Sequence, residues 1–295
     1  MSDGNDLMRK EYWLSRAPEL HIASPELCNA LAGIGLPAEQ TPALHKLMLE
    51  EGYLQITVKD WQIDMALMAQ TVRALDADGL SPVFAFIYDE FWIPLFKLHQ
   101  VYQEFLGDYL VLPDFWIWNV DPARGDAGWR PHRDKNRHAL FPDGRPKSLS
   151  TWIPLTPATT LNGCMYIVPA NRDQTYNTPD EDKWTFELPA VRALPAMPGD
   201  FFIWNQALLH WGSQASPRGG ESRISMAFET QRADVPPMNQ PVMPPLQLQS
   251  FERRLQLICK QVLQYRHMYK VDPRIEALAL SVLGPDAVQP KAPVA

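Results

Sequence analysis

Residues 198–212 read PGDFFIWNQALLHWG, and this stretch decides the fold that we expect. A Pro-Gly-Asp turn leads into DFFIWN, a short apolar run whose aromatic residues are typical of β-strands. His210 lies near the end of the stretch, where a β-barrel would bring it back beside earlier parts of the chain. The stretch therefore predicts the strand DFFIWN and, after it, a histidine that the barrel would bring to a site.

Short runs of the same kind fill the chain from about Leu112 to Arg232. They are separated by Pro, Gly, Asn and Asp, and no helical pattern lies between them. The clearest strand candidates besides DFFIWN are FWIWNV (115–120), STWIPL (150–155), CMYIVP (164–169) and RISMAFET (223–230). An antiparallel barrel or sandwich is favoured over a parallel α/β sheet.

The two ends of the chain have helical patterns. Helices are expected at 41–51, where Thr41 would be the N-cap, and at about 61–75 and 90–106, with an early strand in YLQITV at 53–58. After the proline-rich residues 233–245, an apolar stripe at steps of three and four predicts one C-terminal helix; it comprises Phe251, Leu255, Ile258, Val262, Tyr265 and Tyr269. This stripe should pack on the barrel or on a second subunit.

The expected fold is mainly β with flanking helices in a single domain over residues 1–295. It divides into a mainly helical region 1–110, a β-barrel core 111–232, a connector and C-terminal helix in 233–285, and a tail at 286–295.

Composition excludes several classes of protein. Hydrophobic residues make up 46% and charged residues 21%, which is usual for a soluble globular chain. The net charge of −7 without a basic stripe disfavours nucleic acid as a partner, and no apolar run approaches the roughly 18 residues of a membrane span. Three separated cysteines with no CxxC pair indicate neither a disulfide framework nor a thiolate zinc site, so a reducing cytoplasm is expected.

The chemistry is expected to centre on His132 and Asp134. In an extended segment, residues two apart point to the same face, so this imidazole and carboxylate can reach one metal ion. An HxD pair alone can also be a surface ion pair. With His210 as the third ligand, the set is the two-histidine, one-carboxylate triad that suits Fe(II) and leaves positions open for a co-substrate and O₂.

Arg223 and Ser225 lie two residues apart in RISMAFET, so both side chains should project from one face of a strand. A guanidinium pairs with a carboxylate through two parallel hydrogen bonds, and a hydroxyl can satisfy a further lone pair. The alternative is an arginine in a surface salt bridge, which contributes little. Together with the triad, Arg223 is the favoured anchor for a dicarboxylate.

Four segments in this order resemble the phytanoyl-CoA dioxygenase family: HRD (132–134), NGCMYIVPAN (162–171), PGDFFIWNQALLHWG (198–212) and SRIS (222–225). The resemblance covers roughly residues 50–232. It implies a double-stranded β-helix, or jelly-roll barrel, that binds Fe(II) through His132, Asp134 and His210. It further implies that Arg223 binds the distal carboxylate of 2-oxoglutarate and that Trp152 lines the co-substrate pocket. Ser225 is added from strand parity.

The activity that this resemblance implies is a dioxygenase reaction that consumes O₂, releases succinate and CO₂, and oxidises a small-molecule metabolite, most simply by hydroxylation. Asp134 favours hydroxylation over halogenation, because related halogenases have a small, non-coordinating residue at this position. Many members carry a hydroxylated residue two places after the distal histidine, whereas this chain has Gly212 there and Ser213 next. The role of Ser213 therefore stays open.

Three other functions remain open from the sequence: a protein hydroxylase, a metal-free jelly-roll binding protein, and a cupin-like isomerase or hydrolase with another divalent ion. The intact triad and Arg223 argue against the second, and the third leaves Arg223 unexplained. Substrate specificity should reside in the N-terminal segment and in loops near 135–148 and 171–184.

Several polar residues near the motifs can be interpreted either as part of the site or as structural or solvated residues. Asn119 either borders the pocket or is a buried, satisfied amide, and His138 is expected in an exposed loop. The basic residues of loop 135–147 either attract an anionic substrate or are solvated; they are Lys135, Arg137, Arg145 and Lys147. The expected partners are a small-molecule substrate and, through the C-terminal helix, a second copy in a homodimer.

Overall fold

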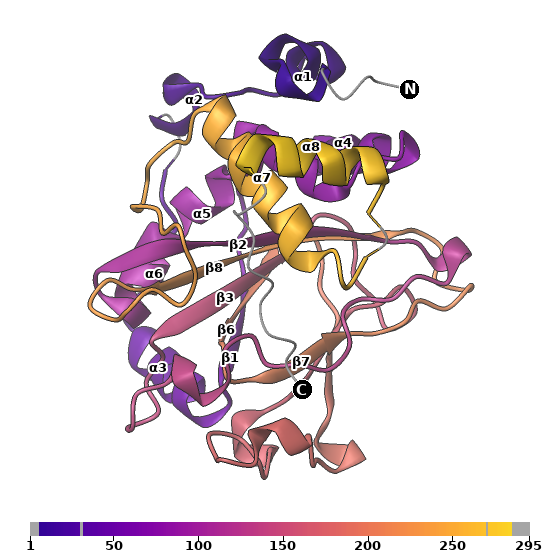
Figure 1. Cartoon of the computed structure of the whole chain (residues 1–295). Coiled ribbons are helices and arrows are strands. Elements are labelled where there is room, and N and C mark those ends of the chain that lie inside the picture. The colour runs from indigo at the N-terminus through magenta and orange to yellow at the C-terminus, as the bar shows by residue number, and fades with distance from the viewer. Residues whose placement is uncertain (1–5, 30–31, 270, 285–295) are drawn as a thin grey trace.

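The computed structural model describes residues 6–29, 32–269 and 271–284, so the expected tail at 286–295 lies outside the described residues. Two antiparallel β-sheets form the centre, and helices cover one face of the larger sheet (Figure 1). The predicted class, mainly β with flanking helices, is confirmed at this level.

The larger sheet contains five strands in the order β1-β6-β3-β8-β2, and every paired neighbour is antiparallel. The strands are β1 (Tyr53–Thr57), β2 (Tyr109–Val120), β3 (Ser148–Pro154), β6 (Asp200–Asn205) and β8 (Arg223–Arg232). All residues of β3 and β6 are buried, so these central strands have both faces covered. The apolar runs that predicted these strands are confirmed, and β2 begins earlier than expected.

The smaller sheet has the order β5-β4-β7 and comprises β4 (Met165–Val168), β5 (Arg192–Leu194) and β7 (Leu209–Gly212). Strands β5 and β7 were not predicted from the sequence, because three or four residues are too few to show the alternation of apolar and polar side chains that marks a strand. Residues 127–132 lie beside β7, where His132 bridges His210 of the strand and Ala127 bridges Gln214 just after it. The pairing shifts by one residue between these two bridges, so the segment does not form a regular strand.

The expected barrel is not closed by hydrogen bonds. Among the described residues, the five-stranded and three-stranded sheets share no paired strand. The segment that runs beside β7 at the outer edge of the smaller sheet is irregular, so the ladder stops there. The observed arrangement is two sheets, with segment 127–132 at the edge of the smaller one.

The single helix expected at 90–106 is wrong, because the structure has two short helices there, and the other expected helices of the N-terminal region differ mainly at their ends. They are α1 (Lys10–Arg16), α2 (Pro25–Asn29), α3 (Thr41–Glu50), α4 (Met65–Ala77), α5 (Ile93–Lys97), α6 (His99–Leu106), α7 (Phe251–Tyr265) and α8 (Pro273–Leu283). Thr41 is the first helical residue and not the N-cap, which is Gln40. Asp64 caps α4 by accepting from Leu67 N, so this helix begins later than the predicted position 61. None of the described helices is long and apolar enough to cross a membrane.

The C-terminal region forms two helices where one was expected. The stripe of α7 is buried against the main core of the same chain, through Phe251, Leu255, Ile258 and Val262. Helix α7 ends at Tyr265, so Tyr269 lies beyond it. Asp272 caps α8 by accepting from Arg274 N. We expected this stripe to pack either on the barrel or on a second subunit, and in the structure it packs on the core of its own chain.

A buried ion pair joins α7 to the helical layer. The side chains of Arg254 and Asp89 are both 0% exposed, and Arg254 Nη2 lies 2.5 Å from Asp89 Oδ1. The same guanidinium donates to the carbonyl oxygens of Ile87 at 2.7 Å and Gln249 at 2.9 Å. One arginine thus connects the first turns of α7 with residues 87–89.

Two glycines allow segment 127–132 to approach β7. A Cβ atom added to Gly128 would lie 2.5 Å from Gly212 Cα, a distance that real Cβ atoms do not show. The backbone bonds around this contact join Gly212 N to Trp129 O at 3.0 Å and Gly128 N to Ser213 O at 3.3 Å. The pairing therefore requires glycine at this crossing.

We predict that Gly128→Ala lowers the free energy of unfolding by about 1–3 kcal/mol, because the new methyl group must push two backbones apart. Urea unfolding followed by far-UV circular dichroism measures the change. Gly33→Ala is the control, since the nearest atom to its added Cβ lies 3.8 Å away. Equal losses in the two variants would contradict a special packing role for Gly128.

Candidate functional site

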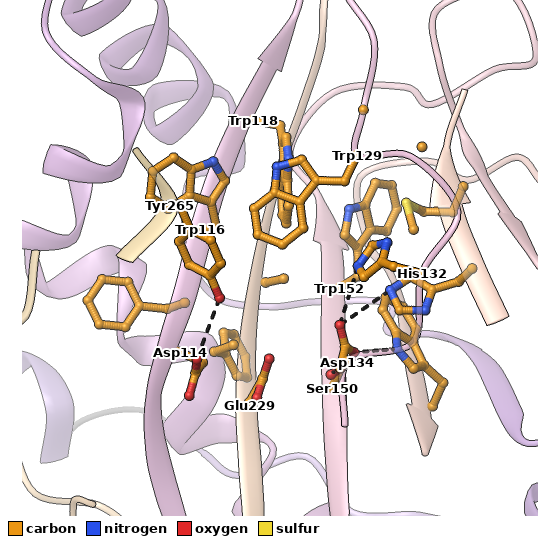
Figure 2. A pocket seen from close by; sticks show the side chains of 18 of the residues that line it. Asp114, Trp116, Trp118, Trp129, His132, Asp134, Ser150, Trp152, Glu229 and Tyr265 are labelled. Carbon is orange, nitrogen blue, oxygen red and sulfur yellow. Dashed lines mark hydrogen bonds and ion pairs between the residues drawn. The ribbon is translucent and has the colours of Figure 1, made fainter. Parts of the chain in front are cut away.

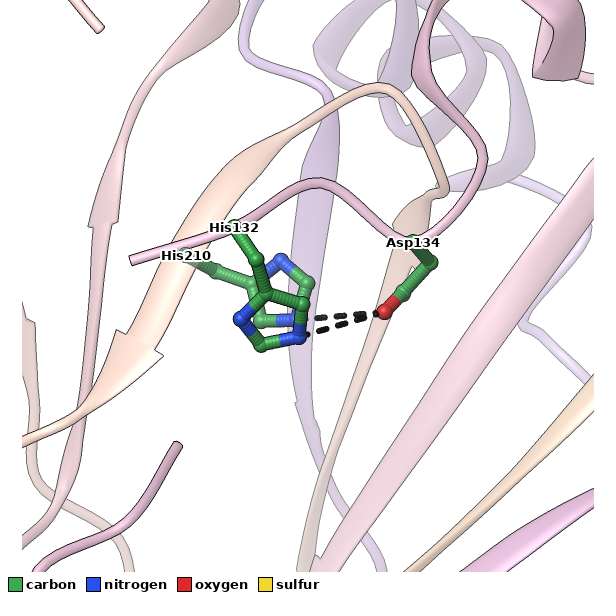
Figure 3. A group of neighbouring side chains, drawn as sticks. All are labelled: His132, Asp134 and His210. Carbon is green, nitrogen blue, oxygen red and sulfur yellow. Dashed lines mark ion pairs between the residues drawn. The ribbon is translucent and has the colours of Figure 1, made fainter. Parts of the chain in front are cut away.

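His132 and Asp134, which are two residues apart, converge with His210, which is distant from them in sequence. His132 and Asp134 lie on the segment beside β7, and His210 lies on β7 itself (Figure 3). Asp134 Oδ1 is 3.4 Å from His132 Nε2 and 3.6 Å from His210 Nε2. The structure thus brings together the three residues that the sequence singled out.

Hydrogen bonds fix both imidazole rings. His132 Nδ1 lies 2.7 Å from Arg130 O, and His210 Nδ1 lies 3.0 Å from Leu208 O. A carbonyl oxygen can only accept, so each Nδ1 carries the proton and each Nε2 keeps its lone pair. The Nε2 atom of His132 is buried and has no well-aligned hydrogen-bond partner among the described residues. Both free lone pairs therefore face the carboxylate and the space beside it.

The backbones of the two histidines are also paired. His132 N donates to His210 O, and His210 N donates to His132 O, each at 3.0 Å. The ring centroids are 4.4 Å apart. Because this two-way bridge sets the spacing of the rings, the sheet edge determines the separation of the two nitrogen donors.

Asp134 is oriented by two strands of the larger sheet. Its Oδ2 atom accepts from Ser150 Oγ at 2.6 Å and from Trp204 Nε1 at 3.2 Å (Figure 2). Ser150 and Trp204 are partners in the register of β3 and β6, and Gln206 Nε2 donates to Ser150 Oγ at 3.0 Å. With Oδ2 engaged, Oδ1 is the oxygen that faces the imidazoles.

Electrostatics favour the metal-binding form of Asp134 and His210. For His132, burial alone lowers the pKa, but the hydrogen bond and charge of Asp134 outweigh burial and raise it. Burial alone raises the pKa of Asp134, but the imidazoles of His210 and His132 and the hydrogen bond from Ser150 outweigh burial and hold this pKa well below its usual range. Burial lowers the pKa of His210 to about 4. A carboxylate and a neutral imidazole at neutral pH are the protonation states that metal binding requires.

Arg223 lines the same cavity as the triad. It is 1% exposed, and burial lowers its pKa to about 10. Its Nη1 donates to Ser225 Oγ at 2.6 Å and its Nε donates to Gly163 O at 2.9 Å. Within the described residues it forms no ion pair with a carboxylate. A buried cation with only neutral partners is suited to binding an anion.

Aromatic side chains form much of the cavity wall (Figure 2). Trp152 lines the cavity, lies 5.8 Å from the Arg223 guanidinium, and has a buried Nε1 without a partner among the described residues. The wall also includes Trp116, Trp118, Trp129, Trp204, Tyr265, Asp114 and Glu229. The cavity therefore joins the triad, Arg223 and Trp152 in one space.

The other predicted site residues take varied places. Ser225 is fully buried and contacts Arg223, as strand parity predicted, but it does not line the cavity. Ser213 Oγ lies 3.5 Å from Cys164 O and likewise lies outside the lining. Asn119 donates to Asp76 at 2.9 Å and lines a neighbouring cavity. Ser225 therefore contacts Arg223 from outside the cavity lining.

The basic residues of loop 135–147 are largely engaged within the chain. Lys135 Nζ lies 2.9 Å from Glu229 Oε2, and Arg145 Nε lies 2.7 Å from Asp143 Oδ2. Lys147 Nζ donates to His138 O at 3.4 Å, and His138 is exposed. The side chain of Lys135 is thus largely buried and paired within the chain, which neither interpretation of this loop expected, whereas Arg145 is paired at the surface.

Sequence reasoning missed the residues that orient Asp134. Ser150 could have been found, because it lies two residues before Trp152 in STWIPL and therefore faces the same side of the strand. Trp204 could not, since each aromatic residue of DFFIWN is equally compatible with the core. Trp129 contacts the His132 ring at 5.6 Å between centroids, and no pattern in its irregular segment indicates this.

Solved structures of known proteins resemble this chain at low sequence identity. The non-heme α-ketoglutarate dependent epimerase SnoN from nogalamycin biosynthesis is 18% identical, with 72% of this chain and 93% of that chain covered and a TM-score of 0.52. The non-heme monooxygenase ThoJ is 14% identical, with 81% and 99% covered and a TM-score of 0.51. EctD from S. alaskensis is 17% identical, with 72% and 86% covered and a TM-score of 0.50. These similarities show a shared fold.

A comparison of the sequence with protein-family models identifies the family of this chain. No curated protein matches the chain. The family model for phytanoyl-CoA dioxygenase matches residues 61–222, which is more than half of the 295 residues and includes the converging triad. The chain belongs to the phytanoyl-CoA dioxygenase family.

Proposed function

We propose that this protein is an Fe(II)- and 2-oxoglutarate-dependent dioxygenase that oxidises, most simply hydroxylates, a small-molecule metabolite. The observation that carries the proposal is one cavity lined by two imidazoles, a carboxylate and a buried guanidinium whose partners are neutral. The family match to a dioxygenase supports it.

The donor set fits Fe(II). His132 Nε2, His210 Nε2 and Asp134 Oδ1 face a common point from one side, which leaves other coordination positions for a co-substrate and O₂. The unsatisfied Nε2 of His132 is the kind of buried polar atom that a bound ion would satisfy. When bound, iron with 2-oxoglutarate supplies O₂-dependent oxidation coupled to release of succinate and CO₂.

The chain would hold 2-oxoglutarate by its distal carboxylate at Arg223. Two of the guanidinium's donors already bond Gly163 O and Ser225 Oγ, which fixes its orientation before any ligand binds. Trp152, with its free indole N–H, lines the same end of the cavity. We assign Arg223 and Trp152 to co-substrate binding and Ser225 to orienting Arg223.

The wall formed by Trp116, Trp129 and Tyr265 would exclude water and position the substrate. Their rings contact one another, with Trp129 and Tyr265 centroids 4.8 Å apart. This wall suits a small molecule with apolar or planar surface. It supports a metabolite over a folded protein as the substrate.

The fold and the cellular context extend the proposal. We propose that the two sheets are halves of a double-stranded β-helix and that residues 1–295 form one oxygenase domain. The similarity in fold to SnoN, ThoJ and EctD supports this arrangement. Two free, buried cysteines, Cys164 and Cys259, fit the expected reducing cytoplasm. A homodimer through the C-terminal helix stays a prediction.

We predict that His132→Ala or Asp134→Ala abolishes the visible charge-transfer band that forms when Fe(II) and then 2-oxoglutarate are added without O₂, because the iron loses a ligand. Succinate formation should fall below detection while the circular dichroism spectrum is retained. His138→Ala serves as control, since this nearby histidine is exposed. A well-folded unsubstituted protein that gives no band would refute the co-substrate assignment, and band formation in both triad variants would refute the ligand assignment.

We predict that Arg223→Ala weakens 2-oxoglutarate binding roughly 10- to 100-fold, the equivalent of losing hydrogen bonds to a charged group worth about 1.5–3 kcal/mol. The apparent affinity is read from the same band, and Fe(II) binding without co-substrate should change little. Arg232→Ala is the matched control, because Arg232 lies at the far end of the same strand and pairs with Asp234. An unchanged affinity in Arg223→Ala would exclude the anchoring role.

A further inference from the structure

Arg133 lies between two of the triad residues, and its side chain is buried among partners from other parts of the chain. Arg133 and Asp173 side chains are each 1% exposed, and Arg133 Nη2 lies 2.6 Å from Asp173 Oδ2. Nη2 also donates to Thr175 Oγ1 at 3.2 Å. Nη1 donates to Ala207 O at 2.6 Å, and Nε donates to Glu181 O at 3.3 Å. We call these contacts the Arg133 network.

The network connects three pieces of chain that meet at the triad. Asp173, Thr175 and Glu181 belong to the loop 173–182, whereas Ala207 lies in the turn just before β7 and therefore close in sequence to His210. In an extended segment, residue 133 points away from the face shared by 132 and 134. The guanidinium thus holds the back of the ligand segment while the ligands face the cavity.

Further hydrogen bonds join the same loop to the residues that follow Asp134. Arg137 N donates to Glu181 Oε2 at 2.7 Å, and Asn136 Nδ2 donates to Asp182 Oδ1 at 3.2 Å. Loop 173–182 therefore bonds to both sides of Asp134 in the sequence. It also lies within one of the two loops in which we expect substrate specificity to reside.

We propose that Arg133 is a positioning residue that couples the order of loop 173–182 to metal binding at the triad. The inference rests on the proposed metal site and concerns what surrounds it. A guanidinium with four partners in fixed directions restricts both the ligand segment and the loop, and a lysine ammonium cannot reproduce this planar fork. Because coupling between two binding equilibria is reciprocal, an ordered loop strengthens metal binding and a bound metal orders the loop.

The test uses the full-length protein with Co(II) alone as the probe, so it needs neither substrate nor turnover. Arg133→Lys should bind Co(II) roughly 10- to 100-fold more weakly, the usual effect of losing a residue that orients metal ligands. In the unsubstituted protein, Co(II) should slow amide hydrogen exchange in residues 173–182. In Arg133→Lys this slowing should be lost.

Arg254→Lys provides a matched control. Arg254 also pairs with a buried aspartate through Nη2 and donates through Nη1 and Nε to two carbonyl oxygens, but its partners lie in the helical layer. Both variants should lower the melting temperature, and only Arg133→Lys should lower Co(II) affinity. An Arg133→Lys protein that melts lower but binds Co(II) within about twofold of the unsubstituted protein would overturn the proposal and leave Arg133 a purely structural residue.

A milder variant covers the case in which Arg133→Lys does not fold. Thr175→Val keeps the Arg133–Asp173 ion pair and removes the hydroxyl that accepts from Arg133. This variant should fold, bind Co(II) several-fold more weakly, and show faster amide hydrogen exchange in residues 173–182. Unchanged Co(II) affinity and unchanged amide exchange would overturn the proposal. An unsubstituted protein that binds no Co(II) would overturn both this proposal and the metal site. If Co(II) binding and loop order are coupled as expected but the iron-loaded protein forms no succinate, only the oxygenase function would be rejected.

Discussion

The site depends on the pairing of an irregular segment with a four-residue strand. The two hydrogen bonds between His132 and His210 set the separation of their rings, and the Gly128 and Gly212 crossing lets the two backbones approach. Neither feature contributes a large core, yet both must form before three donors can face one point. Metal-site geometry here is a property of the backbone first and of side chains second.

Buried charges around the cavity fall into two kinds. The guanidinium of Arg133 is neutralised by Asp173 and uses its donors on protein acceptors. Arg223 is equally buried but contacts only a carbonyl and a hydroxyl. Since an uncompensated buried charge is costly, the charge of Arg133 is already balanced within the protein, whereas the charge of Arg223 is not balanced by a carboxylate. This contrast, more than the number of basic residues, supports the proposal that Arg223 is the anchor.

The sequence predicted the central strands and the three converging residues for a common reason: each leaves a local pattern. The run DFFIWN became β6 without a change of bounds, and the HxD spacing put His132 and Asp134 on one face. Strand β7 was missed because it is short, and the roles of Trp204 and Arg133 were missed because they depend on contacts across 70 and 40 residues. Long-range partners of this kind leave no periodic signal in the chain.

Two parts of the protein that differ in rigidity hold the metal ligands in place: the larger sheet and the loop 173–182. Asp134 is oriented by Ser150 and Trp204, which lie on strands buried on both faces. On the outer side, the ligand segment is held through Arg133 by a loop without regular strands or long helices. Dense sheet packing resists displacement, whereas a loop opens locally at lower free-energy cost. The inner support therefore sets the geometry at the metal, and the outer one is where affinity and substrate access can change without disturbing the fold.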